Sequence, residues 1–112
     1  LQMAIAHVYD HYTETLRLGD VAELVEMVPS TFSRFFKKQT GHNFARFVNQ
    51  LRVNHACRLL VGSGKSITEI CFESGFNNTA NFNRQFFAFC NETPSSYREK
   101  VLEIAGAARS AS

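Results

Sequence analysis

Residues that interrupt helices are scarce in this chain of 112 residues, which has two prolines, six glycines and no tryptophan. Apolar residues make up 45% and include 11 phenylalanines, so the chain can bury a modest core and is not disordered. It has no apolar run near the roughly 18 residues that cross a bilayer. Its N-terminus has no basic segment before a small-residue cleavage site. We therefore expect neither a membrane-spanning helix nor a secretory signal in this sequence.

Recognisable disulfide, metal-binding and catalytic motifs are also missing. Cys57, Cys71 and Cys90 are odd in number, widely spaced and without a CxxC pair, so we interpret them as small buried apolar residues in a reducing cytoplasm. His7 and His11 could begin a metal site on a helix, but no third ligand has a matching spacing. No nucleophile–base pair, glycine-rich phosphate loop or carboxylate pair is recognisable. We expect neither an enzyme nor a cofactor or metal site.

Acidic side chains are absent from residues 29–65, which carry seven basic ones. Residues 1–28 carry one basic and five acidic side chains, and residues 66–112 carry four basic and five acidic ones. An ordinary solvated face would mix both signs. An acid-free basic segment inside a globular chain is typical of a protein that binds a polyanion.

The apolar periodicity predicts an all-α fold of seven helices with short loops. The expected helices cover residues 2–13, 18–26, 29–39, 44–61, 66 to the break at Gly75, 78 (or 77) to 89, and 93–108. Capping signals support these limits: Asn43, the capping box Ser66-x-x-Glu69, and Thr93 followed by Pro94 mark helix starts. The stripes expected to face inward are Ile5, Val8, Tyr9 and Tyr12; Leu18, Val21, Leu24 and Val25; and Phe44, Phe47, Val48, Leu51, His55, Arg58 and Leu59.

An internal repeat links the second and third helices to the fifth and sixth. Phe32, Arg34 and Phe36 recur 50 residues later as Phe82, Arg84 and Phe86. Leu18, Val21 and Ala22 recur 49 residues later as Ile67, Ile70 and Cys71, so the second copy has one extra residue, expected near Gly75. A short helix, a tight turn and a second helix, with a small residue at the close approach, predict a helix-turn-helix. An ordinary helical hairpin is the alternative. We call residues 18–39 the first module and residues 66–89 the second module.

Helical phase predicts which side chains the second helix of the first module exposes. Phe32, Phe35 and Phe36 form its buried stripe. The face opposite this stripe consists of Ser30, Ser33, Arg34 and Lys37, with Thr31 and Lys38 on its flanks. Arg34 could contact guanine O6 and N7, and Lys37 and Lys38 could neutralise phosphates.

The second module repeats this arrangement with different side chains. Phe82, Phe86 and Phe89 are expected to be buried, and Ala80, Arg84 and Phe87 to lie opposite, with Asn81 and Asn83 on the flanks. Arg84 repeats the role of Arg34. Asn81 could pair with adenine N6 and N7, and Ala80 could touch a thymine methyl group.

At these residues the sequence resembles the DNA-binding domain of the AraC/XylS family of bacterial transcription regulators. The matching segments are TFSRFFKKQTG, LRVNHACRLL, ITEICFESGFNN, NFNRQF and TPSSYR. The resemblance implies two helix-turn-helix subdomains of the homeodomain-like type, at residues 1–42 and 63–112, joined by a linker helix at 43–62. It carries base reading onto Ser30, Ser33 and Arg34, and onto Thr79, Ala80, Asn81 and Arg84. Thr31, Lys37, Lys38 and Asn78 complete the candidate DNA-binding set.

The resemblance also has departures. Phe87 and Ala88 stand where the family usually has lysines, Asn91 replaces a glycine, and Val28 replaces a polar cap. We therefore expect the first module to supply most of the affinity for DNA.

The sequence as a whole predicts sequence-specific binding of double-stranded DNA for regulation of transcription in the cytoplasm of a bacterium. The two recognition helices would enter adjacent segments of the major groove. RNA polymerase is a candidate partner, and the resemblance implies an upstream effector-sensing or dimerisation domain, with which the missing start methionine is consistent. The alternative is a helical protein-interaction module that docks through an apolar patch near Phe87.

Overall fold

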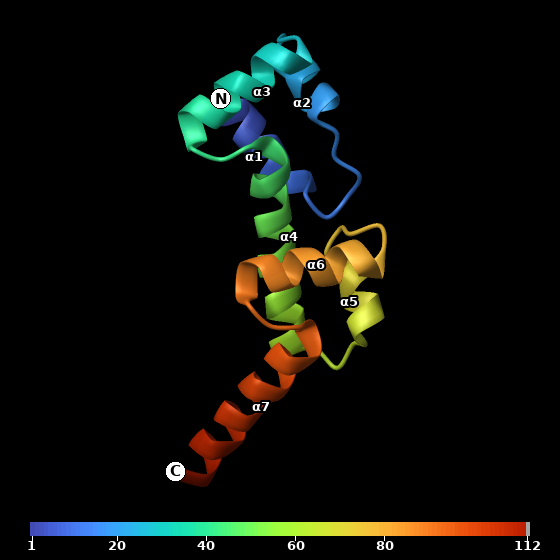
Figure 1. The fold of residues 1–112 in the computed structure, drawn as a ribbon, viewed down its shortest axis with the longest axis vertical. Helices are drawn as coiled ribbons and strands as arrows, with labels where there is room; N and C mark the ends of the chain where they lie inside the picture. Colours follow the sequence, from blue (N-terminus) through green and yellow to red (C-terminus); the bar gives the residue numbers. More distant parts are fainter. Residues whose placement is uncertain (112) are drawn as a thin grey trace. The chain divides into compact units, whose positions relative to one another are not determined.

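The computed structural model describes the backbone of residues 1–111 and the side chains of residues 1–106 (Figure 1). Over these residues the chain is entirely helical, as predicted. Its elements are α1 (Gln2–His11), α2 (Leu18–Leu24), α3 (Pro29–Thr40), α4 (Phe44–Gly62), α5 (Ile67–Glu73), α6 (Thr79–Cys90) and α7 (Pro94–Ala111). In the described part of the chain, no helix combines the length and apolar character needed to cross a bilayer.

The chain divides into an N-terminal unit, Leu1–Arg52, and a C-terminal unit, Val53–Ser112. The boundary falls inside α4, so each half of this helix contributes to the core of one unit. The subdomain limits inferred from the resemblance, with a separate linker helix, stay a prediction.

The core of the N-terminal unit is built around three aromatic rings. Phe32 and Phe36 from α3 and Phe44 from α4 pack with ring centroids 5.4–5.8 Å apart. Such tilted and edge-to-face pairs add to the free energy of burial itself. The buried residues of this core are Ala4, Val8, Val21, Ala22, Phe32, Phe36, Phe44 and Val48.

The core of the C-terminal unit repeats this design. Phe82 packs against Phe76 and Phe86 at 5.2 and 5.9 Å, and Phe86 meets Tyr97 edge to face at 5.6 Å. In the N-terminal unit, Phe36 meets Phe47, which lies 50 residues before Tyr97, at 5.2 Å in the same manner. The buried residues here are Val53, Ala56, Leu60, Ile70, Cys71, Phe76, Phe82 and Phe86.

The turns of the two modules share one hydrogen-bond pattern. Met27 N–H donates to the Ala22 carbonyl at 2.9 Å, and Phe76 N–H donates to the Cys71 carbonyl at 3.2 Å. Both pairs are offset by 49 residues, whereas the helices that follow, α3 and α6, are offset by 50. The extra residue of the second module is therefore Asn77, which lies just after the turn and not within it. Ala22 and Cys71 are fully buried, which explains why a small side chain recurs there.

Each unit also contains an arginine that binds the end of a preceding helix. Arg52 Nε donates to the Tyr12 carbonyl at 2.7 Å and its Nη2 to the Glu14 carbonyl at 3.0 Å. Arg98 Nε donates to the Leu60 carbonyl at 3.1 Å and its Nη2 to the Ser63 carbonyl at 3.2 Å. The last carbonyls of a helix lack partners within the helix, so a cationic fork stabilises this end. Partial burial lowers the pKa of Arg52.

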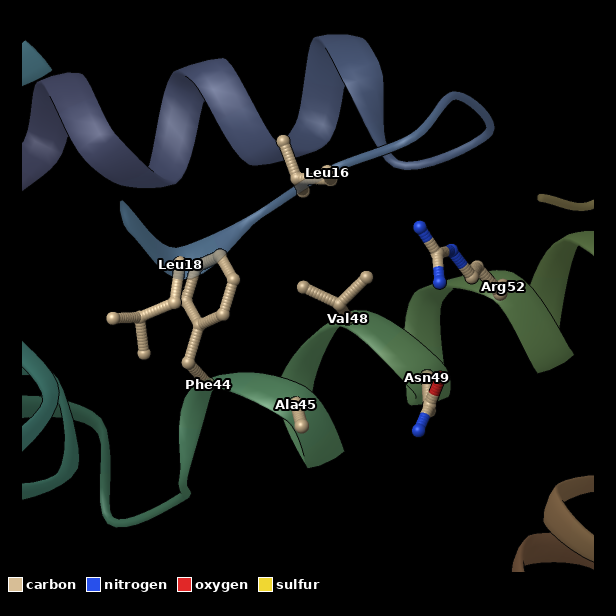
Figure 2. A pocket seen from close by; sticks show the side chains of 7 residues that line it. All are labelled: Leu16, Leu18, Phe44, Ala45, Val48, Asn49 and Arg52. Atoms are coloured by element: carbon tan, nitrogen blue, oxygen red, sulfur yellow. The ribbon is translucent and has the colours of Figure 1, made fainter. Parts of the chain in front are cut away.

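A cavity of about 220 Å³ lies beside Arg52, and Figure 2 shows the side chains that line it. It is lined by Leu16, Leu18, Phe44, Ala45, Val48, Asn49 and Arg52. The residue 50 positions after Val48 is Arg98, the helix-binding arginine of the C-terminal unit. Val48 is shorter than Arg98. In the N-terminal unit the helix-binding arginine is Arg52, which lies one turn further along α4.

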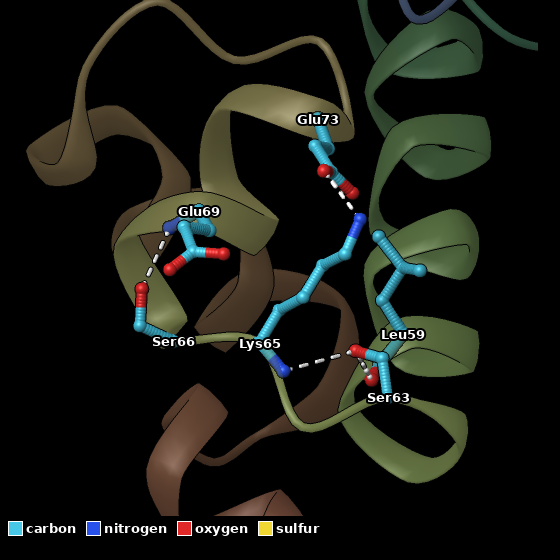
Figure 3. A network of polar contacts seen from close by, with 6 residues as sticks. All are labelled: Leu59, Ser63, Lys65, Ser66, Glu69 and Glu73. Carbon is cyan, nitrogen blue, oxygen red and sulfur yellow. Dashed lines mark hydrogen bonds and ion pairs between the residues drawn. The ribbon is translucent and has the colours of Figure 1, made fainter.

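A network of hydrogen bonds and one ion pair stabilises the connection between α4 and α5 (Figure 3). Ser66 Oγ accepts from Glu69 N–H at 3.1 Å, which confirms the predicted cap of α5. Ser63 Oγ donates to the Leu59 carbonyl at 2.7 Å and accepts from Lys65 N–H at 3.4 Å. Lys65 Nζ forms an ion pair with Glu73.

Some of the expected inward stripes are wrong in detail. Leu24 and Tyr9 are 43% and 54% exposed, because the buried positions in their helices are Val21 with Ala22 and Ala4 with Val8. In α4 the buried positions change phase after Leu51: Val53, Ala56 and Leu60 are buried, whereas Arg58 is exposed and His55 and Leu59 are half-buried. A single stripe cannot describe a helix that serves two cores.

The turns predict opposite effects of glycine substitutions. Glu26 has φ of 59°, in the left-handed region, and the corresponding Gly75 has φ of 104°. Glu26→Gly should raise the free energy of unfolding by about 0.5–1 kcal/mol, because glycine adopts this conformation without the steric cost of a side chain. Gly75→Ala should lower it by about 1–3 kcal/mol. Urea denaturation measures both changes. Glu23→Gly, inside α2, is the control and should destabilise; destabilisation by Glu26→Gly as well would contradict the assignment.

Candidate nucleic-acid interface

Helix α3 is oriented by Phe32 and Phe36, one turn apart and both fully buried. It begins at Pro29 without a side-chain cap, because Val28 precedes it, and it ends at Gly41 with φ of 79°. Gly41 N–H donates to the Lys37 carbonyl at 2.8 Å. Phe35, expected in the buried stripe, is only half-buried and lies outside the buried core.

The candidate DNA-binding residues of α3 lie on the side opposite this buried pair. Ser30, Thr31, Arg34, Lys37 and Lys38 are exposed, and Ser33 is half-buried. Among the side chains that the structure describes, Arg34, Lys37 and Lys38 have no hydrogen bond or ion pair with another residue. Three cations are therefore available on one short helix.

Basic residues elsewhere in the acid-free segment already have structural partners. Arg52 binds the carbonyls after α1, and Lys65 is paired with Glu73. Arg58 lies 3.4 Å from His55 Nδ1. Three exposed cations of the segment thus lie together on α3, whereas Lys65 is neutralised by Glu73.

Helix α6 is oriented by the equivalent pair, Phe82 and Phe86, both fully buried. Asn78 caps it: its Oδ1 accepts from Asn81 N–H at 2.7 Å. Asn91 ends it with φ of 58°, so asparagine does adopt the left-handed conformation at this position. One lone pair of the Asn78 oxygen is thus used by the helix, and its amide nitrogen remains for a DNA contact.

The other candidates of α6 lie on its open side. Thr79, Ala80 and Arg84 are exposed, Asn81 is half-buried, and Phe87 is 54% exposed. Phe87 occupies the place that Lys37 has in α3, as the offset of 50 predicts. The second recognition surface therefore carries one cation and an aromatic ring.

Sequence reasoning missed one feature of this surface. Asn81 Oδ1 accepts from Arg84 Nη2 at 2.9 Å and from Gln85 Nε2 at 3.4 Å. The spacing of three and four residues places these side chains on one face of a helix, so the signal was present in the sequence.

Among the described residues, no cluster of three metal-binding side chains occurs. His7 stacks on His11 with centroids 4.4 Å apart, and His11 Nδ1 lies 2.7 Å from Glu14 Oε2. Burial, and then the adjacent Arg58, lowers the pKa of His55 against an opposing effect of Glu73. Burial, and then the neighbouring Cys57, raises the pKa of the Cys90 thiol to about 11. All three cysteines are free and partly or fully buried.

Comparison with known proteins identifies the family. Residues 21–100 match a family model described as a helix-turn-helix domain. An AraC-type DNA-binding protein from Chromobacterium violaceum has the same fold, with a TM-score of 0.80 and 28% identity over 90% of each chain. The chain is an AraC-type helix-turn-helix domain. The DNA-binding domain of AdpA, solved in complex with a target DNA, superposes on this AraC-type domain with a TM-score of 0.84 and 26% identity, over 88% of this chain and 89% of AdpA's.

The relatives of this AraC-type domain are named as regulators. The regulatory protein PocR of Salmonella typhimurium is 36% identical over 103 residues, which are 92% of this chain and 34% of PocR. The HTH-type transcriptional regulator YobQ of Bacillus subtilis is 32% identical over 88% of this chain and 41% of its own length. The AraC-type domain thus spans about a third of PocR.

The two recognition helices should respond oppositely to changes at their N-caps. Val28→Ser should raise the free energy of unfolding by about 1 kcal/mol, because a hydroxyl can accept an unpaired N–H of the first turn of α3. Asn78→Ala should lower it by a similar amount, because it removes the cap of α6. Thermal unfolding measures both, with Asn77→Ala as the matched control beside the cap. A Val28→Ser variant no more stable than the wild type would contradict the assignment of Val28 as an unsatisfied cap.

Proposed function

We propose that this AraC-type domain binds double-stranded DNA at specific sequences to regulate transcription, with α3 and α6 as its recognition helices. The observation that carries the proposal is the repeat of one surface. Both helices are held by a buried phenylalanine pair and expose an arginine, Arg34 or Arg84, at the same position. The AdpA domain solved with a target DNA supports it.

In this proposal the exposed face of α3 divides into two roles. Lys37 and Lys38, in the last turn, neutralise phosphates, which raises affinity for any DNA sequence. Arg34, one turn earlier, reaches the base edges and contacts guanine O6 and N7. Ser30, Thr31 and Ser33 contact bases or phosphates beside it.

Helix α6 has fewer electrostatic contacts to offer. Arg84 is its one cation, and Thr79, Ala80, Asn81 and the amide nitrogen of Asn78 supply short contacts near its N-terminus. Phe87 and Ala88 replace the lysines of α3 and cannot neutralise phosphates. The first module therefore supplies most of the affinity.

The proposal extends to the whole protein. In this proposal the two recognition helices enter adjacent segments of the major groove. An upstream effector-sensing or dimerisation domain controls this binding, and RNA polymerase is the partner through which it acts. A protein with this function works with DNA in the bacterial cytoplasm and is not an enzyme.

The alternative is a protein-interaction module that docks through Phe87, whose 54% exposure is the observation behind it. Family membership and the DNA complex of a structural relative favour DNA binding instead.

Salt dependence separates the two functions. Affinity for a specific DNA site should fall about 100-fold between roughly 50 and 200 mM salt, as release of counterions from about four phosphates requires. Lys37→Ala and Lys38→Ala should each reduce the slope of log affinity against log salt by about 1. Fluorescence anisotropy measures this, with Lys100→Ala on α7, which pairs with Glu92, as the control. Affinity that hardly changes with salt would support apolar docking instead.

Unequal contributions of the modules predict unequal effects of their arginines. Arg34→Ala should weaken binding to the specific site by more than about 10-fold, and Arg84→Ala by about 10-fold or less, because the second module has fewer phosphate contacts to hold it in place. Arg17→Ala, exposed but outside both faces, is the control. A larger loss for Arg84→Ala than for Arg34→Ala would show that the second module dominates.

A further inference from the structure

The contacts of Asn81 limit what this residue can recognise. Its Oδ1 accepts hydrogen bonds from Arg84 Nη2 at 2.9 Å and Gln85 Nε2 at 3.4 Å. An amide oxygen has two lone pairs, so both are used. The Asn81 side chain keeps only its NH₂ group, which donates.

Adenine recognition by asparagine requires both ends of the amide. The oxygen accepts from adenine N6, and the nitrogen donates to adenine N7. Asn81 can offer an oxygen to adenine only by releasing Arg84 and Gln85. In the observed arrangement α6 presents donors, which suit the O6 and N7 acceptors of guanine.

The same contacts restrain Arg84. An arginine side chain loses considerable rotamer freedom when it binds, and a planar guanidinium must meet guanine in a defined orientation. Asn81 is itself well anchored, because its N–H is held by the cap Asn78 and the next residue, Phe82, is fully buried. Arg84 is therefore held by a firm support before DNA arrives.

Helix α3 has no equivalent support. Thr31 and Phe35 occupy the places of Asn81 and Gln85, and within residues 1–106 the side chain of Arg34 has no hydrogen bond or ion pair. The two modules thus present the same arginine in two states, unrestrained beside lysines in α3 and restrained without lysines in α6.

We propose that Asn81 is a positioning residue that holds Arg84 for guanine, so that α6 reads a G·C pair where Asn81 alone would favour A·T. This inference rests on the proposed DNA-binding function and deepens it. Helix α3 adds electrostatic affinity through Lys37 and Lys38 beside its own arginine, whereas α6 depends on the restrained Arg84 for discrimination between bases.

The test uses the whole chain and a specific site selected from a random DNA pool. The position tested is the guanine at which a change of base most weakens the contact with Arg84. The affinity of the protein for DNA is measured with G·C, with A·T and with 7-deazaguanine, which lacks N7, at this position. The proteins compared are the wild type, Asn81→Ala, Asn81→Asp and the control Asn77→Ala, an exposed asparagine that precedes the helix.

The wild type and Asn77→Ala should prefer G·C over A·T by about 10-fold, the size of one good bidentate contact. Asn81→Ala should reduce this preference to about 3-fold, and Asn81→Asp should restore it, because a carboxylate also accepts from Arg84. Circular dichroism confirms that the variants stay folded.

Two results would overturn the inference while leaving the proposed function intact. One is an unchanged preference for guanine in Asn81→Ala. The other is a selected site with adenine at this position whose preference is lost in both Asn81 variants, which would mean that Asn81 reads adenine directly. Failure of the wild type to enrich any sequence would instead contradict the proposed function itself.

Discussion

The structure depends on two buried phenylalanines placed one turn apart on each recognition helix. Phe32 with Phe36, and Phe82 with Phe86, are fully buried in their respective cores. Removing such a ring costs about 3–5 kcal/mol, which is a large fraction of the stability of a small unit. Because the pair lies along one side of the helix, it sets the rotation of the helix about its axis. The residues two positions after each first phenylalanine, Arg34 and Arg84, are thereby directed to solvent.

The turn before each recognition helix adds a second constraint with a different solution in each module. Both turns need a residue in the left-handed conformation directly before the residue whose N–H binds Ala22 or Cys71. The second module uses Gly75, whereas the first uses Glu26, for which this conformation is unfavourable. The first module also lacks the side-chain cap that the second has in Asn78. The module that carries more positive charge is therefore the one with the less favourable local conformation.

The sequence predicted the parts of this structure that local chemistry determines. The seven helices, the caps at Ser66 and Thr93 and the left-handed Asn91 follow from the preferences of individual residues, and the repeat revealed both modules. The contacts of Arg52 and Arg98 were missed because each joins residues more than 30 positions apart. Leu24 was misplaced because its helix has only seven residues, too few for periodicity to define one face. The hydrogen bond from Arg84 to Asn81 is local, and it could have been found from the spacing alone.

The distribution of charge along the sequence identifies the segment that could bind a polyanion, but not which side chains of that segment form the binding surface. The acid-free segment 29–65 suggested a single basic footprint, yet Arg52 and Lys65 within it stabilise the fold. What remains on α3 is a set of cations that attract any phosphate, and such contacts carry no sequence information. Discrimination between bases needs donors held in defined directions, and restraint matters more for it than charge. The hydrogen bond between Asn81 and Arg84 supplies restraint where the lysines are missing. In the proposed function, Phe87 and Ala88 would therefore lower the affinity of the second module for DNA without lowering its capacity to select a base.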